Sequence, residues 1–317
     1  MPEDALHHPH DKLFKRTFGD PVNAAGFLRL EIPAVLSSVI DWDRLRLEPG
    51  SFVDSHYRHS ESDLLFSAPL GSADCLLYLL FEHQLSPDPW IALRLLRYQV
   101  RIWESWRKAR PNAERLPVII PVVLAQNAEV WRISPRFASL LDIPESLATD
   151  VSGFVPDFTF RLVQLADIEF EAIRGTPAGI LTLRVMKAER VRKLLDEAVW
   201  DESLLIQVPR ETIEALIRYI LNADVDKAAF DRKVIDISNP EVQSTTMTLA
   251  QQIRQEGRQE GRQEGRQEGL WIGKIVNLQE LMGLAPMDPE ALSALPISEL
   301  RLRFEQLRRD YDARLRR

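Results

Sequence analysis

The chain has 317 residues, 45% of them hydrophobic, so it can bury a full core, and its single cysteine excludes a disulfide framework and a cysteine-rich zinc site. Its apolar stretches, such as residues 117–125, are far shorter than the roughly 20 residues of a membrane span, and its first residues lack a signal-peptide pattern, so we expect a soluble, cytoplasmic protein. The formal net charge of -7 argues against a protein that coats DNA by bulk electrostatics, so nucleic-acid contacts require local basic patches.

The first 57 residues predict helices followed by a strand. His10-Asp11-Lys12-Leu13-Phe14-Lys15 opens a helical region that runs to about Ile40, with breaks at residues 19–21 and at Pro33. Residues 44–57 then predict a strand with a turn signal inside it.

A β-hairpin is predicted near residue 70, where two short apolar runs flank a Gly71-Ser72 turn signal. If the loop is Gly71-Ser72, Asp63 lies diagonally from Glu82, and if the loop covers residues 71–74, Asp63 lies directly opposite Glu82. Either register places both carboxylates on one face, about 5–8 Å apart, whereas a three-residue loop would separate them.

Two carboxylates so close repel each other unless a cation lies between them, and oxygen ligands suit Mg²⁺ or Mn²⁺. Such an ion can lower the pKa of a bound water and stabilise charge on a phosphate. Gln84 shares the face of Glu82 and can orient that water, whereas His83 points to the other face and can offer only its backbone carbonyl. Solvated carboxylates at strand ends are the alternative interpretation of this pattern.

The segment from Trp90 to Arg110 predicts an amphipathic helix directly after the hairpin. Its buried stripe is predicted to be Leu93, Leu96, Val100 and Trp103. The neighbouring face is basic and either contacts DNA or is simply the solvated side of the helix; it carries Arg94, Arg97, Arg101 and Lys108.

A continuous β-branched run at residues 116–124 predicts a strand buried on both faces. The helix between it and the hairpin predicts a crossover, hence a mixed sheet with a parallel pair. Residues 158–165 predict a further strand, Pro177 begins a helix, and residues 211–221 predict another. Asn239-Pro240 is the clearest boundary.

The tetrapeptide Arg-Gln-Glu-Gly occurs four times from Arg254 to Gly269. In a helix, each Glu has no Arg three or four residues away, and each Gly costs about 1 kcal/mol relative to Ala, so an isolated helix would be marginal. Two interpretations remain: a helix that packs against the same segment of a second subunit, forming a homo-oligomer, or a flexible spacer. A small helical tail with a basic end follows at residues 270–317.

Several segments in this order resemble the recombination-promoting nuclease (Rpn) / putative transposase family of the PD-(D/E)XK superfamily. These segments are residues 10–15, 62–67, 79–84, 97–99 and 116–121. The resemblance implies an α/β fold with a mixed β-sheet core flanked by helices and a helical C-terminal extension. We expect a nuclease-like domain at residues 1–235, a linker and repeat helix at 236–269, and the tail at 270–317.

The resemblance also implies roles for individual residues. Asp63 and Glu82 would bind Mg²⁺, with Mn²⁺ or Ca²⁺ as alternatives, and Gln84 would replace the superfamily's lysine. A neutral amide can orient water but cannot activate it electrostatically, so more of the rate must come from the metal. Asp11 and Lys15 would be accessory residues. Residues 125–127, Ala-Gln-Asn, depart from the family's aromatic-His-Gly stretch.

The resulting expectation is a Mg²⁺-dependent DNA endonuclease that promotes recombination, with weak sequence preference because no groove-reading motif is present. The alternative is a catalytically weak DNA-binding or assembly protein that retains the nuclease fold. An RNA or single-stranded substrate is compatible with the same residues.

Overall fold

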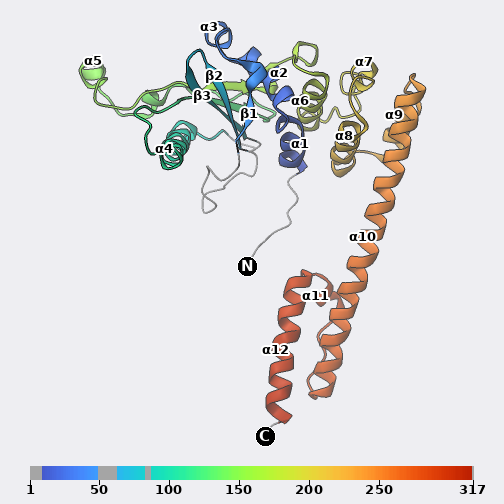
Figure 1. Cartoon of the computed structure of the whole chain (residues 1–317). Coiled ribbons are helices and arrows are strands. Elements are labelled where there is room, and N and C mark those ends of the chain that lie inside the picture. The colour runs from blue at the N-terminus through green and yellow to red at the C-terminus, as the bar shows by residue number, and fades with distance from the viewer. Residues whose placement is uncertain (1–8, 49–62, 83–86, 316–317) are drawn as a thin grey trace. The chain divides into compact units, whose positions relative to one another are not determined.

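The chain forms two compact units, one that extends to Met247 and one that begins at Thr248. The computed structural model describes residues 9–48, 63–82 and 87–315 (Figure 1). Within these residues, no helix is both long enough and apolar enough to cross a lipid bilayer.

The first unit is built on a five-stranded mixed sheet with the order β1-β2-β3-β4-β5. The strands are β1 (Arg46–Leu47), β2 (Leu64–Leu70), β3 (Ala73–Glu82), β4 (Val118–Ala125) and β5 (Arg161–Gln164). β2 pairs antiparallel with β1 and β3, whereas β3, β4 and β5 are parallel. The predicted mixed sheet with a crossover helix is therefore confirmed. Of the predicted strand at residues 44–57, residues 46–47 form β1, and residues 49–57 lie outside the described part of the chain.

The hairpin has the two-residue loop that one of the two predicted registers requires. Leu70 pairs with Ala73, which leaves Gly71-Ser72 as the loop. Gly71 has a φ of 59°, a left-handed conformation that glycine adopts without steric cost. Leu64 pairs with Leu79, so the register continued by one residue places position 63 opposite position 80 and diagonal to position 82.

Helix α4 (Ile91–Ala109) covers one face of the sheet (Figure 1). Its buried residues Leu95 and Ile102 belong to an apolar cluster with Leu65 of β2 and Val123 of β4. The predicted buried stripe was wrong in part, because Leu93 and Val100 are 41% and 43% exposed.

The actual stripe of α4 is rotated around the helix and consists of Ile91, Leu95, Tyr98, Ile102 and Trp106, with Ala92 and Gln99 beside it. The predicted and the observed stripes both have the spacing of a helix face, so the periodicity of apolar residues cannot show which of them is buried. The buried row includes Tyr98, whose polar end had no evident partner in the sequence.

The other face of the sheet is covered by helices that include α1 (Pro9–Phe18), α2 (Pro21–Glu31) and α6 (Pro177–Arg190) (Figure 1). The helices break where predicted: Asp20 caps α2 by accepting a hydrogen bond from Val22 N, and Thr176 caps α6 by accepting one from Gly179 N. Pro21 and Pro177 follow these caps, where a missing N–H costs nothing.

The remaining helices of the first unit are short or follow α6. They are α3 (Ala34–Ser37), α5 (Ala148–Val151), α7 (Glu202–Leu205), α8 (Arg210–Asn222) and α9 (Lys227–Ile235). Helix α8 confirms the helix predicted at residues 211–221 and packs against α1 and α6.

The second unit contains only helices among its described residues. Helix α10 (Pro240–Leu281) starts at the predicted Asn239-Pro240 boundary, inside the first unit, and runs without interruption through the repeat. Its C-terminal end packs with α11 (Pro289–Ser293) and α12 (Ile297–Leu315) around Ile275, Leu292 and Leu300. The predicted helical tail is therefore confirmed.

Candidate active site at the sheet edge beside α4

Tyr98 of α4 lies near the first residue of the predicted metal pair, Asp63, and near three arginines of its own helix. Asp63 directly precedes β2 and is half-buried, and Tyr98 of α4 is 5% exposed. Burial and the Asp63 carboxylate both raise the pKa of the Tyr98 phenol. Three cationic side chains near the same phenol oppose this rise: Arg94, Arg97 and Arg101. The structure thus brings Asp63 together with three of the four predicted DNA-binding residues.

Interactions at the start of α4 fix the position of Arg94. Asp88 accepts a hydrogen bond from Trp90 N at 2.8 Å and forms an ion pair with Arg94 at 3.3 Å. Arg94 is therefore held close to the protein, whereas Arg97 extends into solvent. Lys108 lies ten residues after Tyr98, near the end of the helix, and is exposed. Lys108 is not among the charged residues that act on Tyr98.

The second predicted carboxylate ends β3, and its backbone is in register with Ala125 of β4. Side chains of a strand alternate between its two faces. Position 82 therefore lies on the same face of the sheet as Leu76, and position 63 lies on the same face as Leu65. Leu65 and Leu76 both pack in the cluster beneath α4, so positions 63 and 82 belong to the same face at the same sheet edge.

The rest of the predicted metal site lies outside the described part of the chain. The side chain of Glu82 and the whole of His83 and Gln84 are not described, so their roles stay predictions. Among the described residues, no group of three or more His, Cys, Asp or Glu side chains is arranged to hold a metal ion.

The two predicted accessory residues of α1 have different environments. Asp11 is 3% exposed and lies on the buried side of the helix with Phe14 and Phe18, whereas Lys15 is exposed. Helix α1 contacts α2, α6 and α8.

A buried polar network at the end of β4 was not anticipated from the sequence. Gln126 directly follows β4 and is fully buried. Its Nε2 donates to the carbonyl oxygen of Met186 at 2.8 Å and to the hydroxyl of Tyr219 at 3.0 Å. The same hydroxyl lies 2.6 Å from Nδ1 of His10.

The chemistry of this network follows from the state of the phenol. Burial raises the pKa of Tyr219, so the hydroxyl keeps its proton. Because the hydroxyl oxygen accepts from Gln126, its proton is available for Nδ1 of a neutral His10. The network thus connects α1, α6 and α8 to the end of β4. Ala125, which pairs with Glu82, directly precedes Gln126 there. A Gln-Asn pair directly after an apolar strand was the signal in the sequence.

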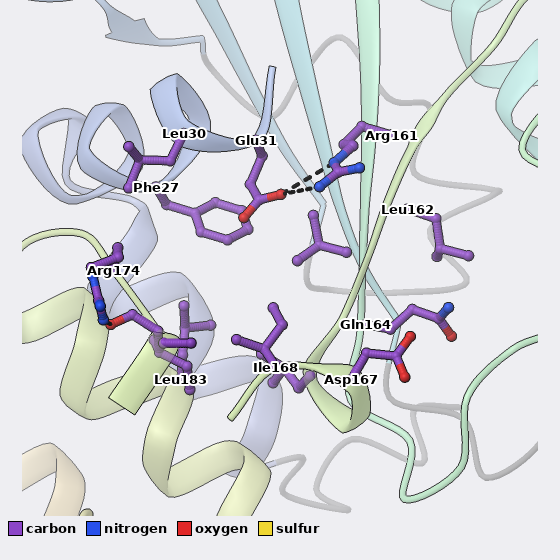
Figure 2. Close-up of a pocket in the computed structure, with 14 residues that line it drawn as sticks. Phe27, Leu30, Glu31, Arg161, Leu162, Gln164, Asp167, Ile168, Arg174 and Leu183 are labelled. Atoms are coloured by element: carbon purple, nitrogen blue, oxygen red, sulfur yellow. Dashed lines mark hydrogen bonds and ion pairs between the residues drawn. The ribbon is translucent and has the colours of Figure 1, made fainter. Parts of the chain in front are cut away.

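A hollow of about 460 Å³ lies on the other side of the sheet, at the β5 edge (Figure 2). Arg161 Nη2 and Glu31 Oε2, 2.9 Å apart, form an ion pair at its rim, and Ile168 and Leu183 contribute apolar surface. Arg161 pairs with Val122, which is out of phase with the α4-facing Val123. This hollow is therefore separate from the group around Asp63.

Comparison with known proteins gives one family. Residues 8–212 match the family described as "Putative transposase, YhgA-like". The chain is 29% identical over 255 residues to the recombination-promoting nuclease RpnD of Escherichia coli O157:H7, covering 77% of this chain and 94% of that protein.

Two further relatives come from Escherichia coli K12. Recombination-promoting nuclease RpnA is 27% identical over 290 residues, which are 90% of this chain and 96% of that protein. The inactive recombination-promoting nuclease-like protein RpnE is 28% identical over 258 residues, 80% of this chain and 84% of that protein. No solved structure matches the chain significantly. The match over most of the chain confirms the resemblance: this protein belongs to the YhgA-like putative transposase family, which it shares with the recombination-promoting nucleases.

Proposed function

We propose that this protein is a metal-dependent DNA endonuclease that promotes recombination by hydrolysing backbone phosphodiesters. The observation that carries the proposal is the grouping of Asp63 with Arg94, Arg97 and Arg101 around Tyr98, at the sheet edge where β3 ends in Glu82. Carboxylates beside guanidinium groups suit a site that receives a phosphate together with a hard cation.

The donor set fits a divalent metal ion. Asp63 and Glu82 would hold it through carboxylate oxygens, which suit Mg²⁺ best and also accept Mn²⁺ or Ca²⁺, and the backbone carbonyl of His83 is a further oxygen donor. When bound, such an ion lowers the pKa of a coordinated water and neutralises charge on the phosphate. Gln84 would orient the attacking water through its amide.

The residues of α4 supply the rest of the chemistry. Arg97 and Arg101 would bind non-bridging phosphate oxygens and stabilise the charge that develops on them. Tyr98 has a raised pKa and stays protonated, so its hydroxyl can donate a hydrogen bond in the same region. Arg94 forms an ion pair with Asp88, which partly neutralises its charge, so it would contribute less to phosphate affinity.

Nicking of supercoiled plasmid in the presence of Mg²⁺ tests the proposal. We expect Asp63→Ala and Glu82→Ala to lose cleavage while circular dichroism stays unchanged. Glu104→Gln removes an exposed carboxylate from α4 and is the matched control, which should cut like the wild type. Cleavage retained in both alanine variants would refute the assignment. Duplex, single-stranded and RNA substrates assayed in parallel identify the polymer that is cut.

A second candidate function is a catalytically weak protein that binds DNA or assembles on it with the nuclease fold. The inactive relative RpnE supports this candidate, because it is as similar to this chain as the relatives named as nucleases. Calorimetric titration with Mg²⁺ separates the two functions. A site-specific binding heat that Asp63→Ala abolishes supports the nuclease, whereas its absence in the wild type supports the binding protein.

We further propose that the repeat forms a homo-oligomer through α10. The repeat is helical yet exposed, and a Cβ atom built on Gly257, Gly261, Gly265 or Gly269 would have no atom within 4 Å apart from its chain neighbours and the nearby backbone of its own helix. The glycines therefore receive no packing from the described residues of the same chain, although each costs about 1 kcal/mol in helix propensity. Packing against a second copy would offset this cost.

Light scattering tests the assembly. Deletion of residues 254–269 should lower the mass, and the paired change Gly261→Leu and Gly265→Leu should do the same by blocking close approach. The matched pair Gly261→Ala and Gly265→Ala keeps the side chains small and should preserve the mass. An unchanged mass after deletion would support the spacer instead.

A further inference from the structure

Trp90 is the one exposed tryptophan among the seven of this chain, all of which lie in described residues. It is 59% exposed at the start of α4, whereas Trp106, Trp131 and Trp200 are buried. Its backbone N–H donates to Asp88, and its indole N–H has no acceptor among the described residues. Exposing so large an apolar ring is costly unless a partner covers it.

The position of Trp90 relative to the basic residues indicates that partner. Arg94, Arg97, Arg101 and Lys108 follow it at spacings of four, seven, eleven and eighteen residues, which place all of them along one side of a helix with 3.6 residues per turn. Two acidic residues, Asp88 and Glu104, accompany this row, so its net charge is positive. The ring therefore continues a cationic row.

We propose that Trp90 stacks on an unpaired base of the substrate, so that this protein prefers DNA with single-stranded character over uninterrupted duplex. Proteins that bind single strands combine cationic side chains along the backbone with aromatic rings under the bases. In a duplex the base faces are already stacked and offer no surface to the ring.

This inference rests on the proposed function and defines its substrate class. Trp90 precedes Tyr98 by eight residues, about 12 Å along the helix axis at 1.5 Å per residue. The row thus leads from Trp90 to the arginines that lie with Asp63 around Tyr98. A DNA strand bound along this row would have the base that stacks on Trp90 a few nucleotides from the phosphate bound near Asp63.

Fluorescence anisotropy of labelled oligonucleotides in EDTA measures binding without cleavage. The probes are a duplex, a single strand of the same sequence, and a duplex with an unpaired internal loop. Trp90→Ala should weaken binding of the single strand and the loop about tenfold and binding of the duplex less than twofold. Trp90→Phe keeps a ring and should retain most of the affinity.

Two control variants separate stacking from charge and from protein association. Arg97→Gln should weaken all probes alike and reduce the salt dependence by about one ion. Leu93→Ala should have little effect. Equal losses on all probes in Trp90→Ala, or no loss on any, would overturn the stacking role. A lower oligomer mass by light scattering in Trp90→Ala, with unchanged nucleic-acid affinity, would overturn it in favour of a protein interface.

The same experiment distinguishes the inference from the proposed function. Selective loss of single-strand binding in Trp90→Ala, in a protein that cuts no substrate, would support the stacking role and contradict the nuclease. Cleavage of plasmid with unchanged probe selectivity in Trp90→Ala would support the nuclease and contradict the stacking role. A wild-type protein that binds no probe would contradict both.

Discussion

Removal of the Tyr219 hydroxyl tests whether the buried network holds the end of β4. In Tyr219→Phe, the ring stays in place, but the hydroxyl that contacts Gln126 at 3.0 Å and His10 at 2.6 Å is lost. A neutral hydrogen bond contributes about 0.5–1.5 kcal/mol net, and a buried donor left without an acceptor costs about 1–3 kcal/mol. Gln126 keeps Met186 as an acceptor, so we expect a loss of about 2 kcal/mol in the free energy of unfolding.

Urea unfolding followed by circular dichroism measures this loss, and a double-mutant cycle with Gln126→Leu assigns it. The two side chains touch, so their effects should not add, and we expect a coupling energy of about 1 kcal/mol. Additivity of the two substitutions, or a change below about 0.5 kcal/mol in Tyr219→Phe, would refute the reasoning.

Two further predictions concern stability. Lys187 is buried and donates hydrogen bonds to two backbone carbonyls. Burial lowers its pKa below the usual value of about 10.4. At pH values between the lowered pKa of the folded state and the usual pKa of the unfolded state, the folded state therefore binds fewer protons than the unfolded state. The free energy of unfolding should therefore rise with pH as pH 10 is approached, and urea titrations at several pH values should show a smaller rise in Lys187→Met; equal slopes would contradict this. Gly26→Ala would bring a Cβ atom to 2.9 Å from Thr176 Cγ2 and should cost about 1–3 kcal/mol. The control Gly153→Ala has no atom within 4 Å and should change thermal stability little, so similar melting temperatures for the two variants would refute the packing argument.

Local patterns were sufficient for much of the fold. The Gly71-Ser72 turn signal predicted the hairpin, and the buried run before Ala125 predicted a parallel strand beyond a crossover helix. Helix starts at Pro21 and Pro177 were visible because caps and prolines act on adjacent backbone groups. These features depend on neighbours in the chain, so the sequence alone contains the information.

The sequence also determined the family, because its motifs keep their order along the chain and residues 8–212 match as a unit. The prediction that Asp63 and Glu82 form a pair came from their spacing around the turn, and the observed register, continued by one residue, keeps both positions on one face.

Only the tertiary structure decided which side of α4 is buried, because the sheet selects one of two apolar rows that share the same period. This selection exposed Trp90 and Leu93 and brought Tyr98 to Asp63. The contact between His10 and Tyr219 spans 209 residues and could not be read from any local pattern. Such choices depend on the shape and polarity of surfaces that meet only after folding, whereas propensities and turn signals act between residues that are already neighbours.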